Sequence, residues 1–196
     1  KGIAQDAIVM NLDDMACAGA INNFILSSTI GRNKNHIPGE VIKSGIDETV
    51  AFADTMENYG INISLAGGET ATAGDIIRKI DVGYTAFARF KKKEVIEINI
   101  QDEDVIVGLA SFGKASYEDS YNSGIGCNGL TSARHDVLGK YLMAKYPESF
   151  DPHIPDDLIY SGSKKITDKY NGSDIGHLLL SPTRTYLPVI REIVQK

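Results

Sequence analysis

The sequence predicts an α+β protein divided into two αβ domains, residues 1–98 and 99–196. Segments with the period of an amphipathic helix alternate with short apolar segments of strand length. A charged run, Lys91–Glu94, interrupts that pattern where one αβ unit finishes, and helix and strand patterns occur on both sides of it. A chain of 196 residues is long enough for one large domain or two small ones.

The first half is predicted to contain two helices and three strands. In chain order, they are a helix over residues 4–18, a strand over 23–30, a helix over 38–59 and strands over 61–65 and 80–90. The second helix, with a proline in its first turn and a glycine at its end, has the signals of a helix start and stop. Its expected buried stripe is Ile42, Ile46, Val50, Ala53 and Met56.

The second half has weaker patterns. Residues 105–110 are an apolar run that predicts a buried strand. A loop rich in Gly, Ser, Asn and Tyr follows over 111–129, and loops of that length are often functional or mobile. Helices are expected over 128–146 and 184–194, with a polar, irregular stretch over 147–171.

Composition excludes several classes of protein. The net charge of -6 argues against a nucleic-acid binder, and no apolar run has the length of a membrane span. Cys17 and Cys127 form no metal-binding pair, which favours a reducing, cytoplasmic location. The chain enters an apolar-periodic stretch directly at Lys1, so a segment upstream of it is expected.

The first cluster with chemical potential is Asn11-Leu12-Asp13-Asp14, on the first predicted helix. Adjacent carboxylates on a largely apolar helix are costly unless they are solvated or hold a cation, and Mg²⁺ prefers carboxylate oxygens. A solvent-facing polar edge is the alternative, because paired acids are common on helix surfaces.

The second cluster is Gly67-Gly68-Glu69-Thr70, which follows a strand. Glycines there let the backbone approach a ligand, and successive amides can form a nest for an anion. Glu69 would then be a second metal ligand. A tight turn with positive φ explains the same glycines without any ligand.

The third cluster is Ser181-Pro182-Thr183-Arg184, which precedes the last predicted helix. Its hydroxyls, its arginine and the amides of the helix start could hold a phosphate. An ordinary helix cap with proline in the first turn is the alternative reading.

Together these clusters resemble, in order and context, the aminoimidazole ribonucleotide synthetase family, also called the phosphoribosylformylglycinamidine cyclo-ligases. The matching segments are Ile3–Ala20, Gly67–Ala71, Asp81–Gly83, Asn128–Gly129 and Leu180–Tyr186, of which the last is the most specific. The chain departs from the family at Thr72–Gly74, where Glu-Met-Pro-Gly is usual, and at Gly126-Cys127, where His-Ser is frequent. The family's upstream Asp-Gly-x-Gly-Thr-Lys motif is missing, and the family continues beyond Lys196, so the chain resembles an internal portion that lacks both ends.

The resemblance implies two αβ domains of the PurM-like type, the first binding ATP and pairing its sheet in a homodimer. ATP would activate the amide of formylglycinamidine ribonucleotide, and closure of the imidazole ring would expel phosphate. Asp14 and Glu69 would act in catalysis and hold Mg²⁺, while Asp13, Gly67, Gly68 and Thr70 would contact the nucleotide. Asn128, Gly129, Thr183 and Arg184 would bind the ribonucleotide substrate. The alternatives are a related enzyme of the formylglycinamidine synthase, thiamine-phosphate kinase or selenophosphate synthetase type, or a homologue that has lost catalysis.

Overall fold

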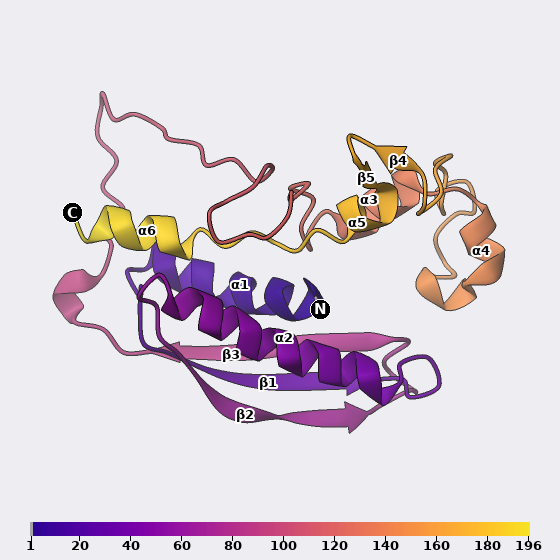
Figure 1. Ribbon diagram of the computed structural model, residues 1–196, viewed down its shortest axis with the longest axis horizontal. Helices are drawn as coiled ribbons and strands as arrows, with labels where there is room; N and C mark the ends of the chain where they lie inside the picture. Colours follow the sequence, from indigo (N-terminus) through magenta and orange to yellow (C-terminus); the bar gives the residue numbers. More distant parts are fainter. Residues whose placement is uncertain (1) are drawn as a thin grey trace.

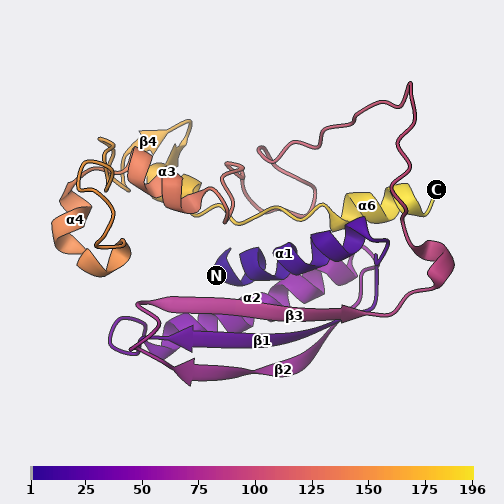
Figure 2. The ribbon, with the colours of Figure 1, turned by 180° about the vertical axis from the view of Figure 1, so that it is seen from behind.

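The computed structural model describes residues 2–196 and confirms a mixed α and β architecture. The first half is a three-stranded sheet with two helices on one of its faces (Figures 1 and 2). Its elements are α1 (Gly2–Cys17), β1 (Phe24–Arg32), α2 (Gly39–Glu57), β2 (Ile63–Thr72) and β3 (Ile80–Ala88). Every helix and strand predicted for this half is therefore present. Four of the five lie within two residues of their expected bounds, whereas β2 continues seven residues beyond its predicted end at Leu65.

The sheet has the strand order β2-β1-β3, with β1 parallel to β2 and antiparallel to β3. The β1–α2–β2 unit makes the parallel pair, since such a pair needs a crossover connection. The register shifts by one residue beside Leu26 and Ser28, where β2 carries an extra residue, and Gly67 has a φ of 99° there. The Gly-Gly pair consequently lies inside β2 and forms a bulge within the strand.

The main hydrophobic core lies between the helices and the inner face of the sheet. Its buried residues are Ile8, Val9, Leu12, Ala16, Ala20, Phe24, Leu26, Phe52, Met56, Ile61 and Leu187. Leu187 belongs to α6 (Leu187–Val194), so the last helix completes the core of the first half. Segments at the two ends of the chain thus fold as one packed unit.

The predicted buried stripe of α2 is confirmed only in part. Met56 is buried as expected, but Ile46 and Val50 are exposed, and Thr49 and Phe52 are buried instead. The Thr49 hydroxyl reaches the Tyr84 hydroxyl of β3 at 2.5 Å, which brings this side of the helix onto the sheet. The sequence offers two neighbouring apolar stripes, and packing against β1 and β3 selects the one that carries the aromatic ring.

The second half is built from short elements around a small core of its own. They are η1 (Lys92–Glu94), α3 (Leu130–Val137), α4 (Tyr141–Lys145), η2 (Pro147–Ser149), β4 (Lys169–Tyr170), β5 (Ser173–Asp174) and α5 (Ile175–Leu179). The single helix predicted over 128–146 is two helices, because Leu138 and Gly139 leave the helical path to bridge Lys164 and Gly162. Leu138, Leu142, Ile159 and Tyr160 form the centre of this second core.

The buried strand predicted over residues 105–110 is wrong. The segment has no assigned strand, and the exposed fractions of Val105 and Ile106 are 85% and 100%. An apolar run becomes a strand only when a neighbouring strand satisfies its backbone groups, and no described residue pairs with this one. None of the helices over residues 2–196 combines the length and apolarity that crossing a bilayer requires.

Candidate functional site

The Pro182–Tyr186 segment is held against α1 by two carboxylates. Asp6 accepts hydrogen bonds from the Thr183 amide at 2.7 Å and the Thr183 hydroxyl at 2.8 Å. Asp13 accepts from the Thr185 hydroxyl at 2.6 Å and the Tyr186 amide at 2.8 Å. Because seven residues are about two helical turns, both acids lie on one side of α1. Sequence reasoning missed Asp6, although its spacing of seven from Asp13 was a usable signal.

These contacts correct the expectation that Ser181–Arg184 opens the last helix and offers its amides to a phosphate. The helix α6 begins at Leu187, after Tyr186. The Thr183 and Tyr186 amides are already occupied by carboxylates, which would repel an anion. Tertiary hydrogen bonds to α1 therefore keep this segment out of the helix that its sequence pattern suggests.

The Asp13 carboxylate is engaged in the contact between α1 and the Pro182–Tyr186 segment, so it is not free to contact a nucleotide in this arrangement. Burial raises the pKa of the Asp13 carboxyl above its ordinary value, and it outweighs the hydrogen bonds from Thr185 and Tyr186 that act in the opposite direction. The neighbouring Asp14 is exposed on the solvent side of α1.

Arg184 is buried in an ion pair with Glu118 of the long loop. Its exposed fraction is 9%, and the closest nitrogen–oxygen distance in the pair is 2.5 Å. A further guanidinium nitrogen donates to the carbonyls of Ala110 and Phe112 at 2.8 and 3.1 Å. All three guanidinium nitrogens of Arg184 are thus engaged in hydrogen bonds, and these bonds hold both ends of the segment 110–118 in place.

A small cavity of about 160 Å³ brings together three of the predicted substrate residues, Asn128, Thr183 and Arg184. Its other walls come from the glycine-rich part of the long loop and from Met10 of α1. The Thr183 hydroxyl accepts a hydrogen bond from the Cys127 amide at 3.0 Å, which fixes the loop beside the threonine. Gly129, the fourth predicted residue, is the N-cap of α3 immediately after Asn128.

Cys127 lines the same cavity, but its thiol is not activated. Burial, together with the nearby Asp6 carboxylate, raises its pKa, so the thiol is held in its protonated form. Gly126 has a φ of 60°, and a Cβ there would lie 3.2 Å from the Thr183 hydroxyl oxygen. The tight approach of the loop to Thr183 accounts for this glycine.

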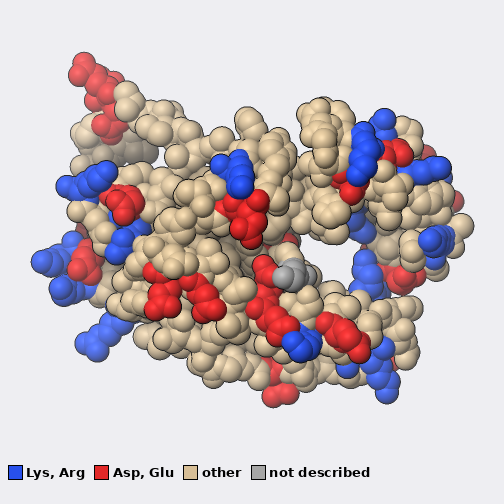
Figure 3. Space-filling view, viewed as in Figure 1, with Lys and Arg blue, Asp and Glu red and all other residues tan. Residues whose placement is uncertain are grey.

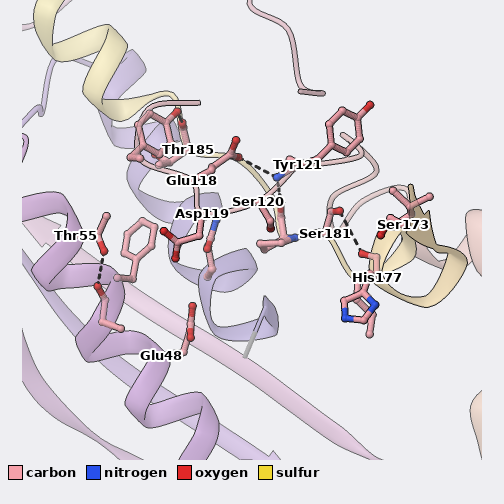
Figure 4. A pocket seen from close by; sticks show the side chains of 18 of the residues that line it. Glu48, Thr55, Glu118, Asp119, Ser120, Tyr121, Ser173, His177, Ser181 and Thr185 are labelled. Carbon is pink, nitrogen blue, oxygen red and sulfur yellow. Dashed lines mark hydrogen bonds between the residues drawn. The ribbon is translucent and has the colours of Figure 1, made fainter. Parts of the chain in front are cut away.

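A larger cavity of about 690 Å³ lies between α2, the long loop and α5 (Figure 4). Glu48 of α2 and Asp119 of the loop project into it from opposite walls, as Figure 4 shows. None of its described lining residues is a lysine or an arginine. The described lining therefore presents carboxylates and hydroxyls and no cation, which is unfavourable for a phosphate group.

The structure does not bring Asp14 and Glu69 together within one chain. The strand register pairs Glu69 with Thr29, whose side chain points to the face of the sheet that the helices leave open. Asp14 is on α1, which covers the opposite face (Figure 1). Over residues 2–196 there is no cluster of three or more His, Cys, Asp or Glu side chains that could hold a metal ion.

Glycine occupies the two positions Gly67 and Gly68 of β2 for different physical reasons. A Cβ on Gly68 would lie 2.6 Å from the Ser28 carbonyl oxygen and closer still to its hydroxyl, so this glycine lets β1 and β2 approach. Gly67 has positive φ, and no atom lies within 4 Å of where its Cβ would be. Only Gly67 therefore leaves open space for a ligand, next to the exposed Thr70.

Comparison with known proteins gives a consistent relationship along the chain. Residues 1–90 match the family model described as AIR synthase related protein, N-terminal domain. Proteins named phosphoribosylformylglycinamidine cyclo-ligase are similar over nearly the whole chain. They include those of Methanocaldococcus jannaschii (32% identity over 98% of this chain), Methanococcus vannielii (29% over 97%) and Pyrococcus horikoshii (28% over 99%). The chain spans 44–46% of the length of these relatives.

Proposed function

We propose that the protein containing this chain is an ATP-dependent cyclo-ligase, because residues 1–90 match the family model of the AIR synthase related N-terminal domain. Its reaction would convert formylglycinamidine ribonucleotide to aminoimidazole ribonucleotide, a step of purine biosynthesis. The observation that supports this most directly is the place of the Pro182–Tyr186 segment. This most specific part of the resemblance lies against α1 and lines the small cavity together with Asn128.

In this proposal the small cavity holds part of the ribonucleotide substrate. The Asn128 side chain is exposed at the cavity and makes no hydrogen bond to a described residue, so its amide is free to bind the ligand. The Thr183 hydroxyl, oriented by Asp6 and the Cys127 amide, supplies a second polar group, and Gly129 allows close approach at the start of α3. Arg184 contributes by holding the loop that forms the wall, because its own donors are engaged by Glu118 and two carbonyls.

We place the nucleotide along β2, where Gly67 and Thr70 are accessible. ATP, when bound, would supply the phosphoryl group that makes the amide oxygen a leaving group. Most catalysis of this type depends on positioning and charge screening. Mg²⁺ does not fit a site made by Asp14 and Glu69 of one chain, since the sheet separates them. We therefore assign no step to a metal ion, and the roles of the two acids remain proposals.

A homodimer formed through the open face of the sheet completes the proposal. Ile25 and Phe87 are paired across β1 and β3 on that face, and both are substantially exposed. The other outward residues of these strands include Ser27, Thr29 and Gly83, which are small enough to let a second sheet approach. Pairing two such faces would remove the two large side chains from water.

The test is an assay of the protein that contains these residues. With ATP and formylglycinamidine ribonucleotide we expect phosphate release coupled to formation of aminoimidazole ribonucleotide, and no comparable consumption of ATP with thiamine phosphate, with selenide, or with formylglycinamide ribonucleotide plus glutamine. Asn128→Ala should raise the KM for the ribonucleotide by about fivefold to tenfold, the equivalent of one lost hydrogen bond, and leave the KM for ATP unchanged.

Asn58→Ala is the matched control, because Asn58 is an exposed residue at the end of α2. Its kinetics should equal those of the unaltered protein. Consumption of ATP with one of the other substrates in place of formylglycinamidine ribonucleotide would refute the proposed reaction. An unchanged KM in Asn128→Ala would refute the location of the substrate site alone.

A further inference from the structure

Three cationic side chains converge where the sheet meets the second half of the molecule. Arg78 and Lys79 directly precede β3, and Arg134 belongs to α3. Arg78 donates to the Phe150 carbonyl, and both terminal nitrogens of Arg134 lie 3.3 Å from the adjacent Ser149 carbonyl oxygen. Two consecutive carbonyls thus hold two guanidinium groups close together. Figure 3 shows Lys and Arg side chains beside the opening between these two parts of the molecule.

Lys79 is within electrostatic reach of both arginines and has no partner of its own among the described residues. It is half-buried, and no hydrogen bond or ion pair joins its ammonium group to a described residue. Burial lowers its pKa, and the positive charges of Arg134 and Arg78 lower it further, against the opposing effect of Glu148. The carboxylate of Glu148 therefore does not fully compensate the positive potential at the Lys79 ammonium group.

The remaining acid of this region is already engaged. Asp151 accepts hydrogen bonds from the His153 amide and ring nitrogen, each at 3.0 Å, and is 3.9 Å from Arg78. It is exposed and is not among the charged groups that shift the pKa of Lys79, so it does not serve as the counter-ion of the lysine. An anion arriving from solvent would relieve the repulsion among all three cations.

We propose that Arg78, Lys79 and Arg134 form a binding site for a phosphate monoester. Planar guanidinium groups offer paired donors to phosphate oxygens, and a lysine adds a compact point charge. The inference rests on the proposed function in one respect: it assigns the 5′-phosphate of the ribonucleotide substrate to this site. The arginine first expected to bind that phosphate, Arg184, is engaged by Glu118, and the large cavity is acidic.

The position of α3 is compatible with this assignment. The helix starts beside Asn128 at the small cavity, and Arg134 follows Gly129 by about one and a half turns, or roughly 8 Å along the axis. One rigid helix thus connects the proposed ribonucleotide pocket with the proposed phosphate site.

The experiment is a binding titration of the 196-residue chain with ribose 5-phosphate, with inorganic phosphate and with ribose, at constant ionic strength. We expect ribose 5-phosphate to bind more tightly than inorganic phosphate, and ribose not to bind. Lys79→Met should weaken the binding of ribose 5-phosphate by about tenfold or more. In NMR spectra the pKa of the Lys79 ammonium group should rise on binding. Lys79 has no partner to lose, so this variant should keep the fold.

Lys43→Met is the charge-matched control, because Lys43 is exposed on α2 and paired only with Asp47 of the same helix. It should bind ribose 5-phosphate as the unaltered chain does. Equal affinity in Lys79→Met, equal weakening in both variants, or binding of inorganic phosphate alone would each overturn the site. None of these results depends on turnover, so they are separate from the assay of the cyclo-ligase reaction.

Discussion

At the scale of single residues, three carboxylates connect the segment 182–186 to the rest of the molecule, and their environments differ. Asp6 and Asp13 accept hydrogen bonds from neutral hydroxyls and amides, whereas Glu118 pairs with a buried arginine. Burial acts to raise the pKa of Glu118, but its bonds with Arg184 and the Ala115 amide outweigh burial and lower that pKa. Acid should therefore weaken the Glu118 contact, whereas it removes the cost of ionising the buried Asp13 carboxyl.

Glu118→Gln should lower the free energy of unfolding at neutral pH by about 3 kcal/mol, because it leaves a buried guanidinium without its counter-charge. A carboxyl whose pKa is lowered by folding stabilises the protein above its unfolded value, here 4.5, and loses that contribution as the pH falls through the folded value. Urea unfolding measured at several pH values should show this loss in the unaltered chain and not in the variant. The pKa of Asp13 is raised in the folded protein, so its effect on stability has the opposite sign. The ionised carboxylate destabilises the folded protein at neutral pH, and protonation in acid removes that cost.

Glu57→Gln, at an exposed position on α2, is the control and should change neither the stability nor its pH dependence. If Glu118→Gln behaved like this control, the ion pair with Arg184 would not be what holds the long loop.

At the scale of secondary-structure elements, the close approach of β1 and β2 depends on Gly68. We expect Gly68→Ala to destabilise the protein by about 2–3 kcal/mol, since the added Cβ meets the Ser28 backbone, which cannot move without breaking the ladder. Thermal and urea unfolding measure this cost. Gly45→Ala within α2 is matched to it, because no atom lies within 4 Å of a Cβ there. This control should stabilise the protein by about 0.5–1 kcal/mol, as alanine favours a helix. The reverse order of the two effects would contradict the role given to Gly68.

At the scale of the whole molecule, one face of the sheet is covered by helices and the other is open. The exposed pair Ile25 and Phe87 is the largest apolar feature among the outward residues of β1 and β3. A second copy of the chain seated there would place the two sheets face to face, at about the 10 Å spacing of packed sheets.

Phe87→Glu should shift the protein from dimer to monomer in analytical ultracentrifugation, because pairing would bury an uncompensated charge. Its thermal unfolding as a monomer should be little changed, since Phe87 is 61% exposed in the single chain. Ile193→Glu, on the exposed side of α6, controls for the added charge and should leave the mass unchanged. A chain that is monomeric before any substitution would contradict the proposed sheet pairing.

Local pattern was sufficient for the first half of the fold. The helices α1 and α2 and the strands β1 and β3 were predictable because each has its own periodicity and a glycine, a proline or a charged run at a boundary. The family resemblance, not local pattern, placed Asn128 and Thr183 among the substrate residues, and the structure brings them into one cavity. Local pattern could not choose between the two apolar stripes of α2, because that choice depends on which side chain fits the sheet.

The sequence by itself determined the order of the elements in the first half, the family resemblance and the residue types able to do the chemistry. Only the tertiary structure decided that residues 183–186 bind α1 instead of extending α6, that Arg184 pairs with Glu118, and that Asp14 and Glu69 lie on opposite sides of the sheet. It also brought Lys79 next to Arg134, 55 positions further along the chain. The physical reason is that periodicity reports only which side of a local element is apolar. Hydrogen bonds and charges between distant segments depend on how those elements pack.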